Sequence, residues 1–128
     1  MKVRPDKQKP EALKKMAEVT LERLDKTDTE KYPSNTLLDY YDVIHKLMEA
    51  ITLGDGIKIK GEGAHQELID FLYKENVFDE QIRVFLQQMR DYRNQISYEG
   101  FMVHKNYVTL NKERIVSIIK NLFEKLVV

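Results

Sequence analysis

Apolar positions recur at helical spacing over most of the chain. Pro10 can occupy a first helical turn, and the spacing after it predicts a helix from Pro10 to about Lys26. A second stripe predicts a helix that ends near Leu53, with Ser34 or Asn35 as its N-cap. The stripes comprise Leu13, Met16, Ala17, Leu21 and Leu24 in the first helix, and Leu37, Tyr41, Ile44, Met48 and Ile51 in the second.

The second half of the chain predicts three more helices. A short one is expected from Ala64 to about Glu75, and a longer one between an N-cap at Asp79 and a stop at Gly100. A last helix is expected after Asn111, which can act as its N-cap. The apolar stripe of the fourth helix contains Ile82, Leu86, Met89 and Ile96, and that of the fifth contains Ile115, Ile118, Ile119, Leu122, Phe123 and Leu126.

Two connecting segments separate these helices. Residues 54–63 contain four glycines around an alternating stretch, which predicts a loop or a small hairpin. Residues 101–109 mix aromatic, β-branched and polar side chains without helical period, so we expect an extended link with room for one short strand. The fold class that follows is all-α, a five-helix up-and-down bundle in which residues 1–128 form one domain.

The composition favours a globular protein and narrows the classes of function. Hydrophobic residues make up 42% of the 128 positions, and basic and acidic residues balance at 21 each. Nucleic-acid contact would therefore depend on a local patch rather than on overall charge. The absence of cysteine excludes disulfides and thiolate metal sites. The charged start lacks the apolar core of a signal peptide, and no apolar run approaches the roughly 20 residues of a membrane span, so we expect a cytoplasmic protein.

Arg93 is the most informative residue, because it falls on the apolar stripe of the fourth helix. A buried guanidinium is costly unless it has a carboxylate partner, an opening toward solvent or an anionic ligand. Phosphate would suit it, since the guanidinium fork binds two phosphate oxygens at once. An ordinary ion pair with one of the 21 acids is the equally open alternative.

Several features together resemble the HEPN family, the higher-eukaryote and prokaryote nucleotide-binding proteins. They are the order of the helices, Tyr40-Tyr41 in the second helix, Gly63-Ala64-His65 opening the third, and Arg93-Asn94 near the end of the fourth. The resemblance spans roughly Leu37 to Leu126, and Arg93-Asn94 is its most specific part. It implies a homodimer, formed through the second and fourth helices, in which the arginine of each protomer faces a shared groove. It implies no metal and no cofactor.

The family's RNA-cleavage motif is incomplete in this chain. Active members use an arginine, often followed by a polar residue, and a histidine four to six residues further on. Arg93 and Asn94 match the first half, but the position five after Arg93 is Tyr98, and no histidine follows until His104. A phenol with a pKa of about 10 is a poorer proton shuttle at neutral pH than an imidazole with one of about 6.5.

The resemblance therefore implies an RNA- or nucleotide-binding protein that is catalytically weak or inactive. Arg93 and Asn94 would hold phosphate, while Tyr92 and Tyr98 would line the groove. The alternatives are an active metal-independent endoribonuclease, in which His104 folds back toward Arg93 or another group replaces the missing histidine, and a structural interaction module whose Arg93 is closed by an internal ion pair.

The family also suggests a partner protein. Some HEPN toxins are paired, in toxin-antitoxin or defence systems, with a nucleotidyltransferase that adenylylates a tyrosine just beyond the catalytic histidine. This chain lacks that His-x-Tyr form, so the resemblance does not assign the modification to Tyr98. Tyr98 could instead offer a surface for base stacking, or be a partly buried tyrosine at a helix end.

Other candidate sites have weaker signals. The loop glycines lack the spacing of a dinucleotide-binding motif, and there is no P-loop. Lys58 and Lys60 share one face of the loop, where they could contact a polyanion or form a solvated edge. His45, His65 and His104 lie in separate predicted elements without zinc-ligand spacing, so we expect no metal site. His45 is expected at the edge of the core, satisfied by a hydrogen bond.

Overall fold

The part of the chain that the structure describes folds into five α-helices. The computed structural model describes residues 1–4, 7–61 and 63–126, and within these ranges it contains no β-sheet. The helices are α1 (Gln8–Asp25), α2 (Pro33–Gly54), α3 (Ala64–Lys74), α4 (Glu80–Glu99) and α5 (Lys105–Lys125). The prediction of an all-α protein with five helices is confirmed.

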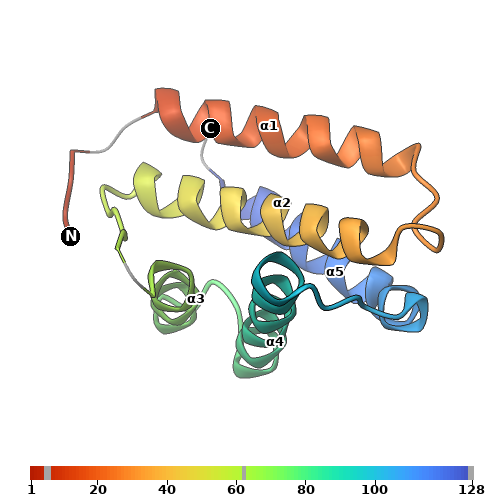
Figure 1. The fold of residues 1–128 in the computed structure, drawn as a ribbon. Helices are drawn as coiled ribbons and strands as arrows, with labels where there is room; N and C mark the ends of the chain where they lie inside the picture. The colour runs from red at the N-terminus through yellow and green to blue at the C-terminus, as the bar shows by residue number, and fades with distance from the viewer. Residues whose placement is uncertain (5–6, 62, 127–128) are drawn as a thin grey trace.

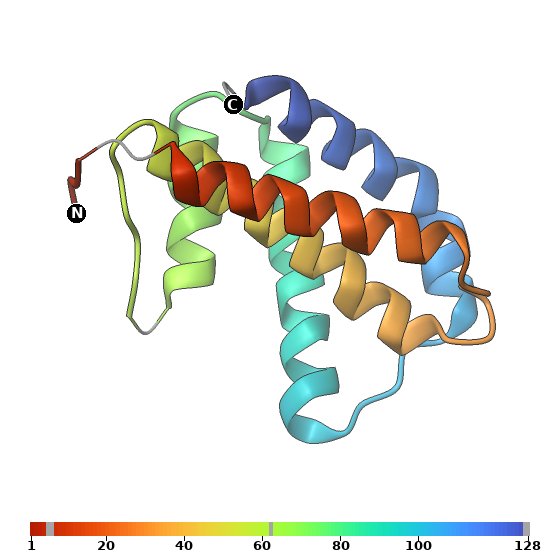
Figure 2. The same ribbon diagram turned by 90° about the horizontal axis from the view of Figure 1, so that it is seen from above.

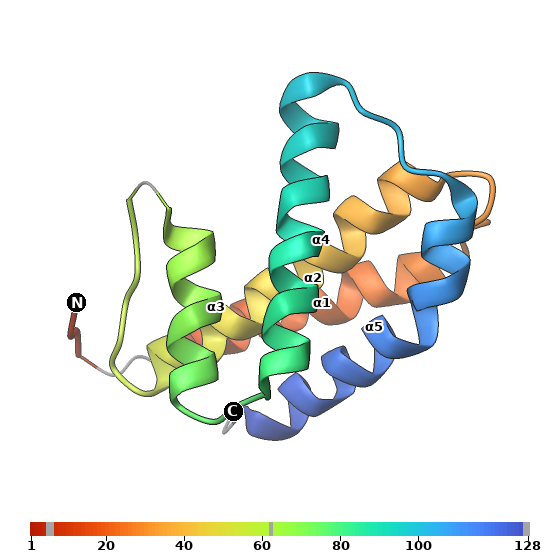
Figure 3. The ribbon, with the colours of Figure 1, turned by 90° about the horizontal axis from the view of Figure 1, so that it is seen from below.

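The central helix of the fold is α2, which contacts all four other helices (Figure 1). Helices α1 and α2 form an antiparallel pair, and α5 runs along α2, as a second view shows (Figure 2). Helices α3 and α4 are antiparallel to each other and cross α2 on the side opposite α1 (Figure 3). A simple up-and-down bundle requires five roughly aligned helix axes. Here the axes of α3 and α4 cross that of α2, so the five are not all aligned.

The core consists mainly of the predicted apolar stripes, although Met16 of the first stripe is 54% exposed. Leu37, Tyr41, Ile44 and Met48 of α2 are almost completely buried. Most of the residues of α2 are buried, which is expected of a helix enclosed by its neighbours. Within the described ranges no helix is both long and apolar enough to cross a lipid bilayer.

The segment after α2 is a loop that pairs with the start of the chain and not with itself. Lys2 and Ile57 form an isolated antiparallel bridge. The Val3 amide donates to the Gly56 carbonyl at 2.7 Å, and the Lys58 amide donates to the Met1 carbonyl at 2.9 Å. The Ile57 amide donates to the Thr52 carbonyl at 2.8 Å, which holds the loop beside the C-terminal end of α2, and residues 54–61 and 63 form no hairpin among themselves.

Two of the predicted helix boundaries of α4 are confirmed, and the N-cap predicted for α2 is wrong. The Asp79 carboxylate accepts a hydrogen bond from the Ile82 amide at 2.9 Å, and Gly100 ends α4 with a φ of 69°. Helix α2 begins at Pro33, so Ser34 and Asn35 lie inside its first turn. The Ser34 hydroxyl instead accepts a hydrogen bond from the Val103 amide at 2.9 Å, which fastens the α4–α5 link to α2.

The predicted start of the last helix is also wrong. Helix α5 begins at Lys105, so only residues 101–104 of the predicted link are extended, and none of them forms a strand. His104 is the N-cap, because its Nδ1 accepts a hydrogen bond from the Asn106 amide at 3.1 Å. Asn111 lies within the helix and donates to the Tyr107 carbonyl at 2.7 Å.

Candidate functional site

Arg93 lies on the apolar stripe of α4, between Met89 and Ile96, where the stripe is only partly buried. Leu86 and Met89 of this stripe are completely buried, whereas Arg93 is partly open to solvent. Its Nη1 donates to Asn94 Oδ1 at 3.1 Å and to the Tyr98 hydroxyl at 3.2 Å, and its guanidinium carbon lies 5.5 Å from the centroid of the Tyr98 ring. Neutral groups therefore hold this cation in place.

No carboxylate of the described residues forms a salt bridge with Arg93. The internal ion pair that would mark a purely structural role is thus missing from the described part of the chain. The remaining explanations for a half-buried guanidinium at this position are the opening toward solvent, which the structure shows, and an anionic ligand.

Three aromatic side chains from α2 and α3 meet beside this part of α4. Tyr41 and His45 are one turn apart on α2, and His65 belongs to the first turn of α3. The His45 and His65 rings are stacked, with centroids 3.9 Å apart and an interplanar angle of 17°. The Tyr41 hydroxyl lies 3.1 Å from His65 Nδ1 in a hydrogen bond whose donor depends on the histidine tautomer.

Both histidines are uncharged at neutral pH. Burial, together with the neighbouring His45, Arg93 and Arg90, lowers the pKa of His65 to about 4. Burial also lowers the pKa of His45. Burial raises the pKa of Tyr41, which stays a neutral phenol that can donate to His65 Nδ1. His65 Nε2 then bears the remaining proton and is itself a hydrogen-bond donor.

The two arginines near the imidazoles differ in how their charge is balanced. Arg90 Nη2 donates to the Asp91 carboxylate at 2.9 Å, and its Nε donates to Gln87 at 3.2 Å. Arg93 makes no such ion pair within the described residues. We call Tyr41, His45, His65, Arg90 and Arg93 the His-Arg site. Among the described residues, the charge of Arg90 in this site is balanced by Asp91, whereas the positive charge of Arg93 is not balanced by any carboxylate.

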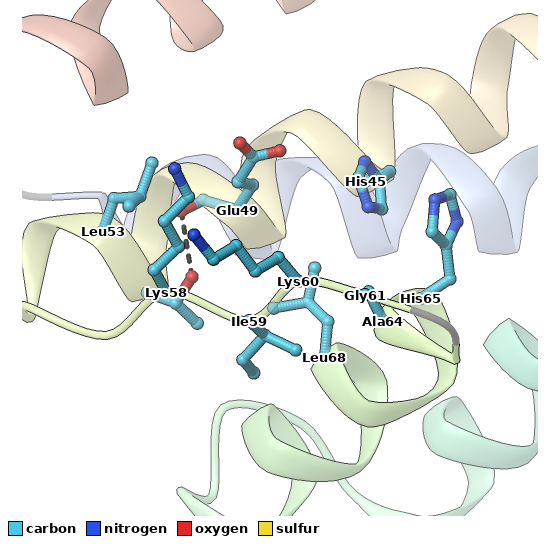
Figure 4. A pocket seen from close by; sticks show the side chains of 11 residues that line it. His45, Glu49, Leu53, Lys58, Ile59, Lys60, Gly61, Ala64, His65 and Leu68 are labelled. Atoms are coloured by element: carbon cyan, nitrogen blue, oxygen red, sulfur yellow. Dashed lines mark hydrogen bonds between the residues drawn. The ribbon is translucent and has the colours of Figure 1, made fainter. Parts of the chain in front are cut away.

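A pocket adjoins the His-Arg site on the side away from α4 (Figure 4). Its volume is about 320 Å³, and it lies between α2, the loop that follows α2, and the start of α3. Its lining combines basic, acidic and apolar side chains: His45, Glu49, Thr52, Leu53, Lys58, Ile59, Lys60, Gly61, Ala64, His65 and Leu68.

The other residues predicted for the site have different surroundings. Tyr98 is 74% exposed and contacts Arg93, and Asn94 also contacts Arg93. Tyr92 is partly buried, with its ring 6.0 Å from that of Phe101 and 4.8 Å from that of Tyr107 of α5. The structure therefore groups Arg93, Asn94 and Tyr98 and places Tyr92 in packing against α5.

His104 is not brought to Arg93 by the contacts of the described residues. Its imidazole is the N-cap of α5, as described above, so this ring nitrogen is occupied by a backbone amide. The imidazoles near Arg93 are His45 and His65, which the sequence did not group with it. Within the described residues no set of three or more histidine, cysteine, aspartate or glutamate side chains could hold a metal ion.

The lowered pKa of His65 predicts that acid destabilises the protein more than it destabilises a His65→Asn variant. The unfolded chain has the ordinary histidine pKa of about 6.5, so it binds a proton more readily than the folded chain as the pH falls below that value. The stability that neutral His65 contributes above about pH 6.5 is lost as the pH falls toward about 4. Because His65 is partly exposed, we expect a difference of about 1–2 kcal/mol.

Urea unfolding of both proteins at about pH 7.5 and about pH 4.5 measures this difference. The carboxylates titrate equally in both, so the variant corrects for them. An identical pH dependence in the two proteins would contradict the buried, neutral state of His65.

No protein-family model, no curated protein and no solved structure matches this chain.

Proposed function

We propose that this chain is an HEPN-like protein that binds RNA or a nucleotide, with a phosphate group on Arg93. The observation that supports this most is the state of Arg93 itself. It is a half-buried guanidinium, oriented by Asn94 and Tyr98, without an ion-pair partner among the described residues. A phosphate would supply the missing negative charge and accept the two parallel hydrogen bonds that the fork can donate.

The neighbours of Arg93 suit the same ligand. Neutral His65, with its Nδ1 bonded to Tyr41, can donate from Nε2 to a phosphate oxygen. The exposed ring of Tyr98 offers a face on which a base can stack. Because the chain has no net charge, such binding depends on this local group and should weaken as salt rises.

The test is incubation of the purified protein with a labelled short single-stranded RNA in EDTA, scoring retention and cleavage together. The proposal predicts retention that falls with added salt, and intact RNA. A protein that neither retains nor cleaves RNA or nucleotides would overturn the proposal and favour an interaction module for a protein partner.

The stacked histidines favour a second candidate, a metal-independent endoribonuclease. The motif lacks its histidine, but His65 belongs to the same site as Arg93 and is uncharged at neutral pH. In the tautomer whose Nδ1 proton is donated to the Tyr41 oxygen, Nε2 can remove the proton of a ribose 2′-hydroxyl. The 2′ oxygen would then attack phosphorus while the bond from phosphorus to the 5′ oxygen breaks. The departing 5′ oxygen would take a proton from water.

This candidate predicts cleavage in EDTA that His65→Asn removes while retention persists. Asparagine keeps hydrogen-bonding capacity but cannot exchange a proton near neutral pH. Cleavage that survives His65→Asn would contradict the assignment of His65 as the base.

We also propose that the protein forms a homodimer and works beside a nucleotidyltransferase, in a toxin-antitoxin or defence system, as the resemblance to HEPN proteins implies. Exposed apolar side chains near the end of α4 support a partner surface next to Arg93: Tyr98, Phe101 and Met102 are 74%, 41% and 79% exposed. Helix α2 is enclosed within the protomer, so α4 is the better placed of the two helices predicted for the interface. Sedimentation at several protein concentrations tests dimer formation.

A further inference from the structure

The pocket beside the His-Arg site has a basic end that the binding of one phosphate at Arg93 does not use. Lys58 and Lys60 come from the loop after α2 and line the same pocket as His45 and His65. Figure 4 shows the two imidazoles at one end of the pocket and the two lysine side chains toward the other. Neither lysine forms a salt bridge with a carboxylate of the described residues.

The position of the lysines is fixed by the fold. The backbone of the loop is hydrogen-bonded to the N-terminal residues through Gly56 and Lys58, and the Ile57 amide donates to the Thr52 carbonyl of α2 at 2.8 Å. Lys58 is partly buried, and Ile59 between the lysines packs against the core. Holding two cations at a pocket wall restricts their motion, which lowers the entropic cost of binding an anion there.

The one acid in the pocket lining is already partly neutralised. The Glu49 carboxylate lies 3.4 Å from the ammonium of Lys9 in α1. The positive charge of Lys58 and Lys60 is therefore larger than the negative charge that remains on Glu49, and the pocket lining has a net positive charge. The wall of the pocket also contains the apolar side chains of Leu53, Ile59 and Leu68, which can accept the face of a base.

The pocket is longer along α2 than one phosphate group. His45 and Leu53 mark the two ends of the pocket along α2, and at 1.5 Å per residue they are about 12 Å apart. The charge of Arg93 acts on both His45 and His65, so Arg93 lies near the imidazole end. Successive phosphates of a polynucleotide are separated by several ångströms, so a single strand can contact both ends where a mononucleotide cannot.

We propose that Lys58 and Lys60 bind a second phosphate of a single-stranded RNA whose first phosphate is on Arg93, with the intervening base or sugar in the pocket. This inference rests on the proposed function and deepens it, because it makes the ligand an RNA strand and not a mononucleotide.

The experiment compares binding of a mononucleotide and of an RNA pentanucleotide to the full chain and to a Lys58→Gln, Lys60→Gln variant. Glutamine removes the charge and keeps most of the side-chain stem. We expect the pentanucleotide to bind about tenfold more weakly and with a shallower salt dependence, whereas mononucleotide binding is unchanged. Lys112→Gln, on the exposed side of α5, is the matched control and should bind both ligands like the unaltered chain.

The other outcomes separate this inference from the proposed function. Pentanucleotide binding that depends on Arg93 but not on Lys58 and Lys60 would overturn the second subsite and leave the proposed function standing. An equal loss of mononucleotide and pentanucleotide binding in the lysine variant would also overturn it, because the lysines would then belong to the first phosphate site. Binding of neither ligand by the unaltered chain would overturn both proposals.

Discussion

Replacing Arg93 with alanine is expected to weaken binding of short single-stranded RNA by about 10- to 100-fold. The charge-assisted hydrogen bonds of one guanidinium to phosphate contribute about 1.5–3 kcal/mol. Folding should change little, because the contacts of Arg93 within the described residues are with Asn94 and Tyr98 at the surface. Fluorescence anisotropy measures the affinity, and thermal unfolding checks that the variant is folded.

Two further variants make the Arg93 result specific. Arg93→Lys keeps the charge but loses the planar fork, so its affinity should lie between those of the unaltered chain and Arg93→Ala. Arg23→Ala removes one positive charge from α1, where Arg23 pairs with Asp39 at 2.9 Å, and should leave affinity unchanged. If Arg93→Ala binds RNA as tightly as Arg23→Ala does, Arg93 is not the phosphate ligand.

The second large effect concerns Tyr41, which joins the core to the His-Arg site. Its side chain is only 1% exposed, so Tyr41→Ala removes a buried ring from the centre of the protein. We expect a loss of about 3–5 kcal/mol in the free energy of unfolding, which is a large part of the stability of a small domain. Urea denaturation followed by circular dichroism measures it.

Tyr41→Phe separates packing from hydrogen bonding at this position. It keeps the ring and removes the hydroxyl that lies 3.1 Å from His65 Nδ1, which should cost about 1 kcal/mol. RNA binding should weaken slightly, since His65 loses the group that orients it. A Tyr41→Phe variant as unstable as Tyr41→Ala would show that the hydrogen bond, and not the ring, dominates the contribution of this residue.

The helix boundaries show which parts of the fold have local signals. Asp79 and Gly100 were correctly predicted, because a capping carboxylate and a residue with positive φ act within one turn of the chain. Ser34 was misassigned, because its hydroxyl bonds to Val103, 69 positions away. His104 was missed as the cap of α5, since an imidazole is an unusual cap and Asn111 offered a more common one.

In the candidate site, too, features with a local signal could be predicted and features set by contacts between distant residues could not. The position of Arg93 on an apolar stripe follows from the spacing along one helix, and the structure places it on that stripe between buried Met89 and partly buried Ile96. The stacking of His45 on His65 joins two helices across a loop, and no spacing in the sequence encodes the way in which α3 crosses α2. The available signal was the one-turn separation of Tyr41 and His45 on the core side of α2.

If an RNA phosphate binds beside the stacked histidines, the three histidines of the chain can report on it directly. We would follow their imidazole proton signals by NMR while titrating the protein with a short single-stranded RNA. We expect the His45 and His65 signals to shift and the pKa of His65 to rise as the phosphate approaches, while the signals of His104, the cap of α5, stay in place. RNA binding that shifts His104 alone, or none of the three, would contradict this expectation.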